Sequence, residues 1–198
     1  MTTKANTYNF TLILQGDVTS DDVLDRLYEA GLDDGTFSEI DGSPIAEFDR
    51  AAPSFEEAVV SGIEEIERAA PELRVVRVAP DDLVTASAIA ERIGRTRQSV
   101  TQLIAGSRGP GGFPPPVAHL DAKTRVWRWT EVSEWLEQIE NGSDDDRRRV
   151  AEFVAAVNGA LESREHLERL AALKPRREAL AATAALVRSR LELSTAGR

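Results

Sequence analysis

Residues 86–104, ASAIAERIGRTRQSVTQLI, decide the fold of the central part of the chain. The small residues Ala90 and Gly94 allow two short helices to meet at a tight turn. A hydroxyl stands where it can cap each helix, Thr85 before the first and Thr96 before the second. Four apolar residues at helical spacing would form the contacts between the helices: Ile89, Ile93, Val100 and Leu103. This spacing predicts a helix-turn-helix.

The second of these helices would expose a run of polar side chains on its outer side. Arginine and glutamine are the residue types that make bidentate hydrogen bonds to guanine and adenine in the major groove of DNA. We therefore expect four residues of this helix to read bases: Arg97, Gln98, Thr101 and Gln102.

A loop, two short strands and a third helix are predicted to follow. Residues 106–116, GSRGPGGFPPP, cannot be helical because they are rich in glycine and proline. Residues 117–120 and 125–129 are typical of two short strands joined by a turn, and residues 131–138 are typical of a helix. The order helix, turn, helix, hairpin, helix is that of a winged helix.

The end of this segment resembles a known family. Residues 125–136, RVWRWTEVSEWL, are similar to the aromatic-rich wing strand and the closing V-x-x-W-L helix of the MerR and excisionase (AlpA-like) superfamily. The family's places in that helix are taken by Val132, Trp135 and Leu136. The resemblance covers residues 83–140 and implies a DNA-binding winged helix-turn-helix, followed by a dimerising helix. The residue after the turn glycine is usually apolar in this family; here it is Arg95, which leaves a looser turn or an arginine that reaches a phosphate as alternatives.

Basic and hydroxyl residues around the same helices are candidates for contacts with the DNA backbone. Arginines on the wing would hold phosphates and position the domain without reading sequence. The phosphate-binding residues that we expect are Arg95, Thr96, Arg108, Lys123, Arg125 and Arg128. We assign Trp127, Trp129 and Trp135 to the core instead, because a wing strand and its closing helix need apolar anchors.

The charge of the chain is distributed unevenly. Its 198 residues carry a net charge of -10, which by itself argues against nucleic-acid binding because phosphate contacts depend on Lys and Arg. Residues 1–80 contain 6 basic and 17 acidic residues, whereas residues 85–129 contain 7 basic and 2 acidic residues. The positive charge coincides with the predicted winged helix, which favours DNA binding over a merely solvated face.

The composition argues against several other classes of protein. The absence of cysteine excludes disulfides, thiol catalysis and cysteine-ligated zinc, and two separated histidines argue against a histidine metal site. No nucleophile, base and orienting group occur in a recognisable arrangement, so we expect no enzymatic activity, no cofactor and no metal. No apolar run approaches the ~20 residues of a membrane span, and the N-terminus lacks a basic-then-apolar signal. We therefore expect a cytoplasmic protein with no membrane partner.

Residues 1–80 are predicted to form an acidic domain of the ferredoxin-like (βαββαβ) fold. Its central hairpin would turn at Asp41-Gly42, and Ser54 would cap its second helix. We expect strands at residues 7–15, 36–40, 43–49 and 73–78, and helices after Thr19 or Ser20 and after Ser54. Because this fold has many functions, a domain that binds a small-molecule or protein effector and a dimerisation sheet both stay open.

Residues 142–198 are predicted to be helical. Apolar residues recur at steps of three and four and Pro175 interrupts them, which indicates a helical hairpin or an interrupted coiled coil. Asn158-Gly159 is a weak point in the first of these helices. The segment has too few large apolar residues for a core of its own, so we expect a second chain to cover the stripe in a homodimer. A segment that folds back on its own chain is the alternative.

Together these features predict an α+β protein with three parts: residues 1–80, 81–141 and 142–198. The function that we expect is sequence-specific binding of double-stranded DNA by a dimeric bacterial transcriptional regulator. Two other classes stay open. One is an excisionase-like architectural protein that bends DNA, and the other is an assembly protein whose winged helix does not bind DNA.

Overall fold

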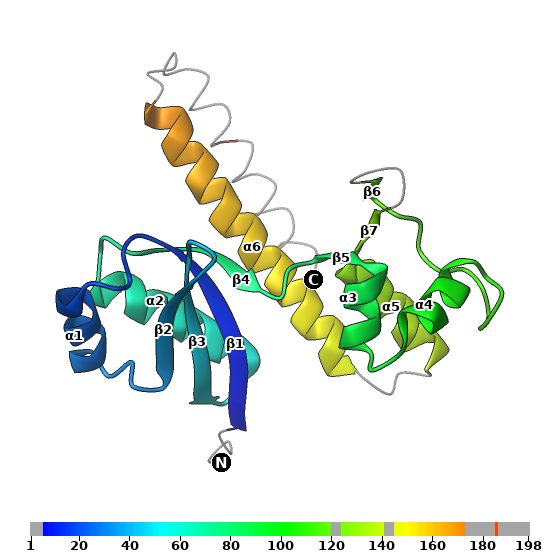
Figure 1. Cartoon of the computed structure of the whole chain (residues 1–198), viewed down its shortest axis with the longest axis horizontal. Helices are drawn as coiled ribbons and strands as arrows, with labels where there is room; N and C mark the ends of the chain where they lie inside the picture. Colours follow the sequence, from blue (N-terminus) through cyan, green and yellow to red (C-terminus); the bar gives the residue numbers. More distant parts are fainter. Residues whose placement is uncertain (1–5, 120–123, 141–144, 173–184, 186–198) are drawn as a thin grey trace. The chain divides into compact units, whose positions relative to one another are not determined.

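The computed structural model describes residues 6–119, 124–140, 145–172 and 185, and it confirms the predicted α+β class (Figure 1). The described residues form two antiparallel sheets and six helices, the last of which is long. None of these described helices has both the length and the apolar composition needed to cross a bilayer. The chain divides into two units, Met1–Asn158 and Gly159–Arg198.

The first sheet and its helices take up the N-terminal part of the chain. In chain order the elements are β1 (Asn6–Gln15), α1 (Asp21–Glu29), β2 (Gly35–Ile40), β3 (Ser43–Ala52), α2 (Phe55–Ala69) and β4 (Arg74–Ala79). The strands lie in the order β2-β3-β1-β4, and all neighbours are antiparallel. The predicted order of strands and helices is therefore confirmed in this part.

Local sequence signals explain two boundaries of this sheet. Asp41 and Gly42 have φ angles of 50° and 76°, as a two-residue turn between β2 and β3 requires, and an Asp-Gly pair adopts these angles readily. The Ser54 hydroxyl accepts a hydrogen bond from the backbone N–H of Glu57 at 3.2 Å and so caps α2. Both predicted signals are confirmed.

The core of this part lies between the sheet and its helices. Phe10, Leu12 and Leu14 alternate along β1 and are buried, and Phe10 stacks on Phe48 of β3 with ring centroids 5.1 Å apart. Arg50 of β3 is also buried, and its guanidinium donates hydrogen bonds to the Asp34 carboxylate at 2.8 and 2.9 Å. A buried arginine in this sheet is thus neutralised by an internal carboxylate.

The second sheet belongs to the segment that contains the predicted helix-turn-helix. Its elements are β5 (Leu83–Thr85), α3 (Ala86–Arg92), α4 (Arg97–Ile104), β6 (Ala118–His119), β7 (Arg125–Arg128) and α5 (Trp129–Ile139). The strands lie in the order β5-β7-β6, and both pairs are antiparallel. Residues 120–123, which include Lys123 at the predicted tip of the hairpin, lie outside the described residues.

The structure corrects two boundaries of this segment and adds a strand. The prediction that Trp129 ends a strand is wrong: β7 ends at Arg128 and Trp129 begins α5, two residues before the predicted start of the helix. The three-residue strand β5 was not predicted, because its only signal is pairing with β7, where Val84 lies opposite Trp127. Short strands of this kind depend on a distant partner and not on local sequence.

The predicted turn between α3 and α4 is confirmed. The Thr85 hydroxyl accepts a hydrogen bond from the N–H of Ala88 at 3.3 Å, and the Thr96 hydroxyl accepts one from the N–H of Ser99 at 3.2 Å. Gly94 has a φ angle of 62° between the two helices. Each helix therefore begins at a side-chain cap, and a residue in the left-handed region separates them.

The tryptophans form the core beneath these helices, as predicted. Trp127, Trp129 and Trp135 are all buried, and they pack in one cluster with apolar residues of α3, α4 and α5. The Trp135 and Trp127 indoles donate N–H hydrogen bonds to the carbonyls of Gly111 and Pro114, at 3.0 and 3.1 Å. The glycine- and proline-rich loop after α4 is thus attached to the core although it is not helical.

The C-terminal described helix is α6 (Asp145–Ala172). It continues through Asn158-Gly159, the predicted weak point. Asn158 is buried and pairs with an edge of the first sheet: its Oδ1 accepts from the N–H of Val78 at 2.7 Å, and its Nδ2 donates to the Val78 carbonyl at 2.9 Å. Pro175 and the second helix of the predicted hairpin lie outside the described residues, except for Ala185.

Candidate nucleic-acid interface

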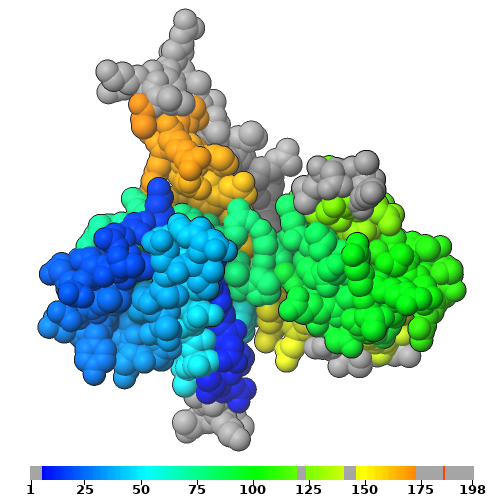
Figure 2. Space-filling model, in the orientation of Figure 1, coloured from blue at the N-terminus to red at the C-terminus, as the bar shows by residue number. Residues whose placement is uncertain are grey.

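The four predicted base-reading residues all lie on α4. Arg97, Gln98 and Thr101 are exposed and Gln102 is half-buried, while Val100 and Leu103 of the same helix are buried in the core. One side of α4 is therefore fixed by packing, and its polar side is exposed. The segment that contains α4 is drawn in green at the surface of the molecule in Figure 2. A helix anchored in this way can present side chains to a surface without moving.

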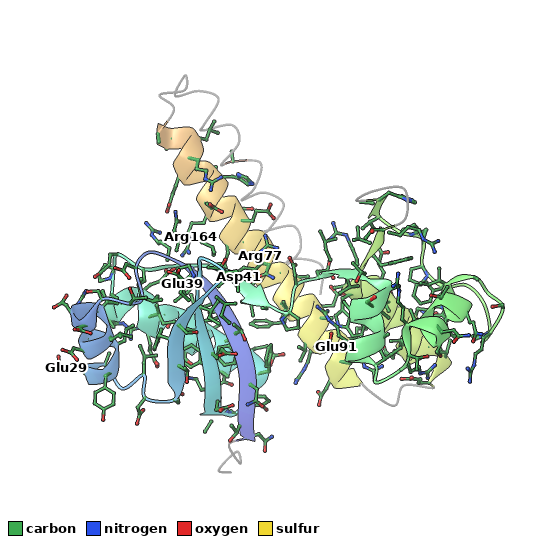
Figure 3. The ribbon with its side chains drawn as sticks, viewed as in Figure 1. Glu29, Glu39, Asp41, Arg77, Glu91 and Arg164 are labelled. Carbon is green, nitrogen blue, oxygen red and sulfur yellow. The ribbon has the colours of Figure 1, made fainter. Side chains whose placement is uncertain are left out.

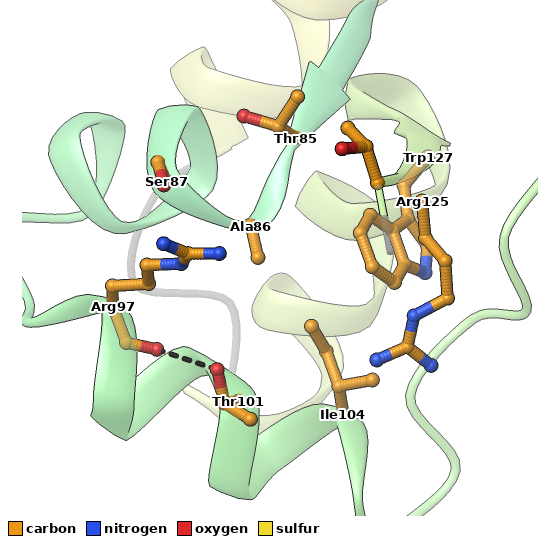
Figure 4. Close-up of a pocket in the computed structure, with 9 residues that line it drawn as sticks. Thr85, Ala86, Ser87, Arg97, Thr101, Ile104, Arg125 and Trp127 are labelled. Carbon is orange, nitrogen blue, oxygen red and sulfur yellow. Dashed lines mark hydrogen bonds between the residues drawn. The ribbon is translucent and has the colours of Figure 1, made fainter. Parts of the chain in front are cut away.

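Hydrogen bonding limits what one of these side chains can do. The Thr101 hydroxyl donates to the backbone carbonyl of Arg97 at 2.9 Å, one turn earlier in α4 (Figure 4). Its only hydrogen is thereby used, so the oxygen retains acceptor capacity and the methyl group remains for apolar contact. Thr101 is therefore suited to accept a hydrogen bond or to contact an apolar group such as the methyl of thymine.

A groove of about 380 Å³ lies beside α4 (Figure 4). Four elements border it: the end of β5, the start of α3, α4, and the strand β7 with the residue before it. Its lining consists of Thr85, Ala86, Ser87, Arg97, Thr101, Ile104, Thr124, Arg125 and Trp127. Arg97 and Arg125 lie on opposite sides of the groove, and none of the described residues that line it is acidic.

Two of the predicted phosphate-binding arginines have carboxylate partners inside the protein. Arg128 Nη1 donates to Asp82 Oδ2 at 2.9 Å, and Asp82 is buried. Arg95 Nη2 lies 3.6 Å from Glu140 Oε1. These internal pairs satisfy part of the hydrogen-bonding capacity of both guanidiniums, so a phosphate would have to compete with a carboxylate for them.

Three other arginines have no such partner. Within the described part of the chain, Arg97, Arg108 and Arg125 form no ion pair with a carboxylate. All three are exposed, and they lie on α4, on the loop that follows it and on β7. Elsewhere arginines are commonly neutralised, as Arg26 is by Glu72 and Arg50 by Asp34. The unpaired guanidiniums thus gather on one segment of the chain.

The local sequence keeps negative charge away from this surface. Residues 92–120 contain no aspartate or glutamate, although the whole chain has a net charge of -10. By contrast, exposed carboxylates such as Glu29, Glu39 and Asp41 lie on α1 and on the hairpin of the first sheet (Figure 3). Exposed carboxylates within about 10 Å repel an approaching anion, and α4 carries no carboxylate.

Arg108 is held near α4 by backbone hydrogen bonds. The N–H groups of Ser107 and Arg108 both donate to the carbonyl of Gln102, at 3.1 and 3.3 Å. The Ser107 hydroxyl donates to the same carbonyl at 3.2 Å. The last turn of α4 therefore positions the backbone of Arg108, whose side chain is exposed.

Arg92 differs from the exposed arginines because its side chain is half-buried against the core. Its guanidinium lies over the Trp129 ring, 5.0 Å from the ring centroid, and its Nη2 donates to the Asp81 carbonyl at 2.6 Å. Burial lowers the pKa of Arg92, although the charges of nearby aspartates oppose this effect. This arginine therefore packs against the core and does not belong to the exposed positive surface.

Sequence reasoning missed the hydroxyl groups of this groove. Thr85, Ser87 and Thr124 border it, but they lie up to about 40 positions apart in the sequence, in no recognisable motif. It also missed the ion pair between Asp82 and Arg128, which lie 46 positions apart in the sequence. Neither feature has a local signal, since both depend on how β5 pairs with β7.

Comparison of the chain with protein-family models, with curated proteins and with solved structures gives no match. Function must therefore be inferred from the residues and the geometry of this surface.

Proposed function

We propose that residues 83–140 form a winged helix-turn-helix that binds double-stranded DNA, with α4 as the recognition helix and the hairpin of β6 and β7 as the wing. The order of elements supports this proposal, because a capped helix, a turn at Gly94, a second capped helix, a hairpin and a closing helix follow one another. A recognition helix enters the major groove with polar residues of its first turns. Arg97, Gln98 and Thr101 are exposed on that part of α4.

One observation carries the proposal: Arg97, Arg108 and Arg125, on and beside α4, have no carboxylate partner among the described residues. A guanidinium without an internal partner keeps its donors for an external anion. Nucleic-acid affinity derives largely from such contacts, because each neutralised phosphate releases counterions. Solubility alone does not require arginines to gather in residues 92–120, which contain no aspartate or glutamate although the chain is acidic.

We assign the first sheet with α1 and α2 to the ferredoxin-like fold. The strand order β2-β3-β1-β4 and the chain order strand, helix, strand, strand, helix, strand support this assignment. We propose that this part binds an effector or a second chain, and that the protein acts as a dimeric, sequence-specific transcriptional regulator. A dimer would place two recognition helices on half-sites about 34 Å apart, or a multiple of that distance.

The test is selection of binding sites from a pool of random duplexes with the full-length protein, followed by titration of the selected duplex at several salt concentrations. We expect a paired motif to be enriched, with a slope of about -2 to -3 per protomer in a plot of log K against log salt, since the three arginines would hold two or three phosphates. Absence of any mobility shift, even at low salt, would contradict DNA binding. It would favour an assembly role instead.

A matched control separates a local effect from a change in net charge. Arg68 is an exposed arginine of α2, and its guanidinium lies 3.9 Å from Glu64. Arg68→Gln removes one positive charge outside the proposed interface, as Arg108→Gln does within it. We expect the Arg108 variant to bind the duplex more weakly and the Arg68 variant to bind as the parent protein does. Equal weakening by both variants would show that only net charge matters.

A further inference from the structure

The side chain of Arg97 does not extend along the outer side of α4. Arg97 lies in the first turn of the helix, and its guanidinium points toward Ala86 at the start of α3, into the groove beside α4 (Figure 4). A side chain that reads a base edge must extend from the helix into the major groove. The observed direction therefore favours a different role from the base-reading role that the sequence predicts.

Arg125 reaches the same groove from the other side. It lies on β7, and its guanidinium is over the Trp127 ring, 5.3 Å from the centroid. Stacking on an aromatic face orients the planar guanidinium and leaves the N–H groups at its edge free to donate. The two arginines thus border one groove from two elements, and within the described residues neither has a carboxylate partner.

The remaining lining suits an anion with several oxygens. Thr85, Ser87 and Thr124 contribute hydroxyl groups, while Ala86, Ile104 and Trp127 contribute apolar surface. Hydroxyls and guanidiniums donate hydrogen bonds, and apolar walls reduce the screening of charge by water. A phosphodiester needs such donors, whereas a base pair within a stacked duplex could not enter a groove at the flank of α4.

We propose that Arg97 and Arg125 clamp a single backbone phosphate of duplex DNA in this groove, joining the recognition helix to the wing. This inference rests on the proposed DNA binding and gives Arg97 the role of a phosphate-binding residue. Sequence reading then falls to the polar residues of α4 that do not line the groove, Gln98 first. Charge-assisted, bidentate hydrogen bonds from two directions would fix the register of α4 in the major groove.

The first experiment compares Arg97→Gln, Arg125→Gln and the double variant of the full-length protein on the selected duplex and on a scrambled duplex of equal length. We expect each single variant to weaken binding to both duplexes by the same factor, about tenfold, and to reduce the salt slope by about 1. The double variant should lose less than the product of the two single losses, because both residues hold the same group. Gln98→Ala should instead change the ratio of the two affinities.

The second experiment identifies the phosphate. Neutral methylphosphonate linkages are placed at one position of the selected duplex at a time, and the affinity of each duplex is measured. At one position the methylphosphonate should weaken binding of the parent protein but leave the affinity of the Arg97→Gln and Arg125→Gln variants unchanged. Far-ultraviolet circular dichroism of each variant shows that the fold is retained, which we expect since both side chains are exposed.

The outcomes separate this inference from the proposed function. If the parent protein binds no duplex at low salt, DNA binding fails and the clamp fails with it. If the parent protein binds but Arg97→Gln changes only the preference between duplexes, Arg97 reads a base and the clamp alone is wrong. The clamp is also wrong if the two variants lose their sensitivity to methylphosphonates at different positions of the duplex. It is wrong as well if the loss of affinity in the double variant equals the product of the two single losses.

Discussion

The buried carboxylate of Asp82 accepts a hydrogen bond from the backbone N–H of Thr130 at 2.9 Å, so it caps α5 from a residue 48 positions earlier in the chain. Its other oxygen accepts from Arg128 Nη1 at 2.9 Å, and its backbone carbonyl accepts from the N–H of Trp129 at 2.6 Å. Arg128, the residue at the usual capping position of α5, makes no side-chain cap itself. Asp82 therefore joins β5, β7 and α5 at one point.

Asp82→Ala is expected to lower the free energy of unfolding by about 1 to 3 kcal/mol, because α5 loses its cap and a buried donor loses its partner. Urea unfolding followed by circular dichroism measures the change. Arg128→Gln is the matched control: it keeps the cap and leaves an amide donor in place of the guanidinium, so it should cost less than Asp82→Ala. An Asp82→Ala protein that unfolds at the parental urea concentration would show that α5 is stable without this cap.

Asn158→Ala is expected to destabilise the first sheet. The Asn158 amide pairs with both the N–H and the carbonyl of Val78, and replacement leaves these two backbone groups unsatisfied at the edge of β4. The expected loss is about 1 to 3 kcal/mol in the free energy of unfolding. Hydrogen exchange of the Val78 amide, measured by NMR, should accelerate. Unchanged protection of that amide would rule out the pairing.

Gly159→Ala, at the neighbouring position, should instead raise the free energy of unfolding. Gly159 lies inside α6, and a Cβ added there meets no atom within 4 Å. Alanine loses less conformational entropy than glycine when a helix forms, so α6 should gain about 0.5 to 1 kcal/mol. An increase in the melting temperature checks this expectation. A decrease would mean that the position does not tolerate a side chain.

Gly94→Ala tests the turn between α3 and α4. The φ angle of Gly94 is 62°, and an added Cβ would meet no atom within 4 Å, so the cost comes from the backbone alone. We expect a loss of about 1 to 2 kcal/mol in the free energy of unfolding. Gly94→Asn should lose less, because asparagine tolerates the left-handed region better. Equal stability of both variants with the parent protein would mean that the turn adopts another conformation.

The pKa of Glu72 gives a prediction about pH. A hydrogen bond from Arg26, assisted by the charge of that guanidinium, lowers the pKa of the Glu72 carboxyl. Since this pKa is lower in the folded protein than in the unfolded chain, the pair stabilises the fold at pH above the unfolded value, and the contribution is lost as pH falls through the folded value. In an NMR titration, Arg26→Gln should raise the pKa of Glu72. An identical titration curve would exclude the pair in solution.

The elements that the sequence predicts correctly are those with local signals. Thr85, Thr96 and Ser54 cap their helices, and Asp41-Gly42 turns the first hairpin, because each of these effects acts over two to four neighbouring residues. The α+β class followed from hydrophobic periodicity in the same way. The strand β5 and the cap by Asp82 could not be predicted, since both depend on residues more than 40 positions away.

The same distinction applies to the candidate site. Placing Arg97, Gln98 and Thr101 together required only the period of a helix. Which arginines remain unpaired could not be predicted, because Glu140 and Asp82 approach Arg95 and Arg128 only in the folded chain. In the sequence all these arginines are equal candidates for phosphate contacts, whereas in the fold only some of them have a carboxylate partner. DNA binding itself stays a prediction.

The distribution of aromatic residues gives the protein a separate optical probe in each part. All three tryptophans of the chain belong to the core beneath α3 and α4, whereas its two tyrosines, Tyr8 and Tyr28, lie on β1 and α1. Indole fluorescence therefore reports on the core beneath α3 and α4, and the Trp127 ring beside Arg125 lines the groove. Occupation of the groove and melting of either part can accordingly be followed in the unlabelled protein.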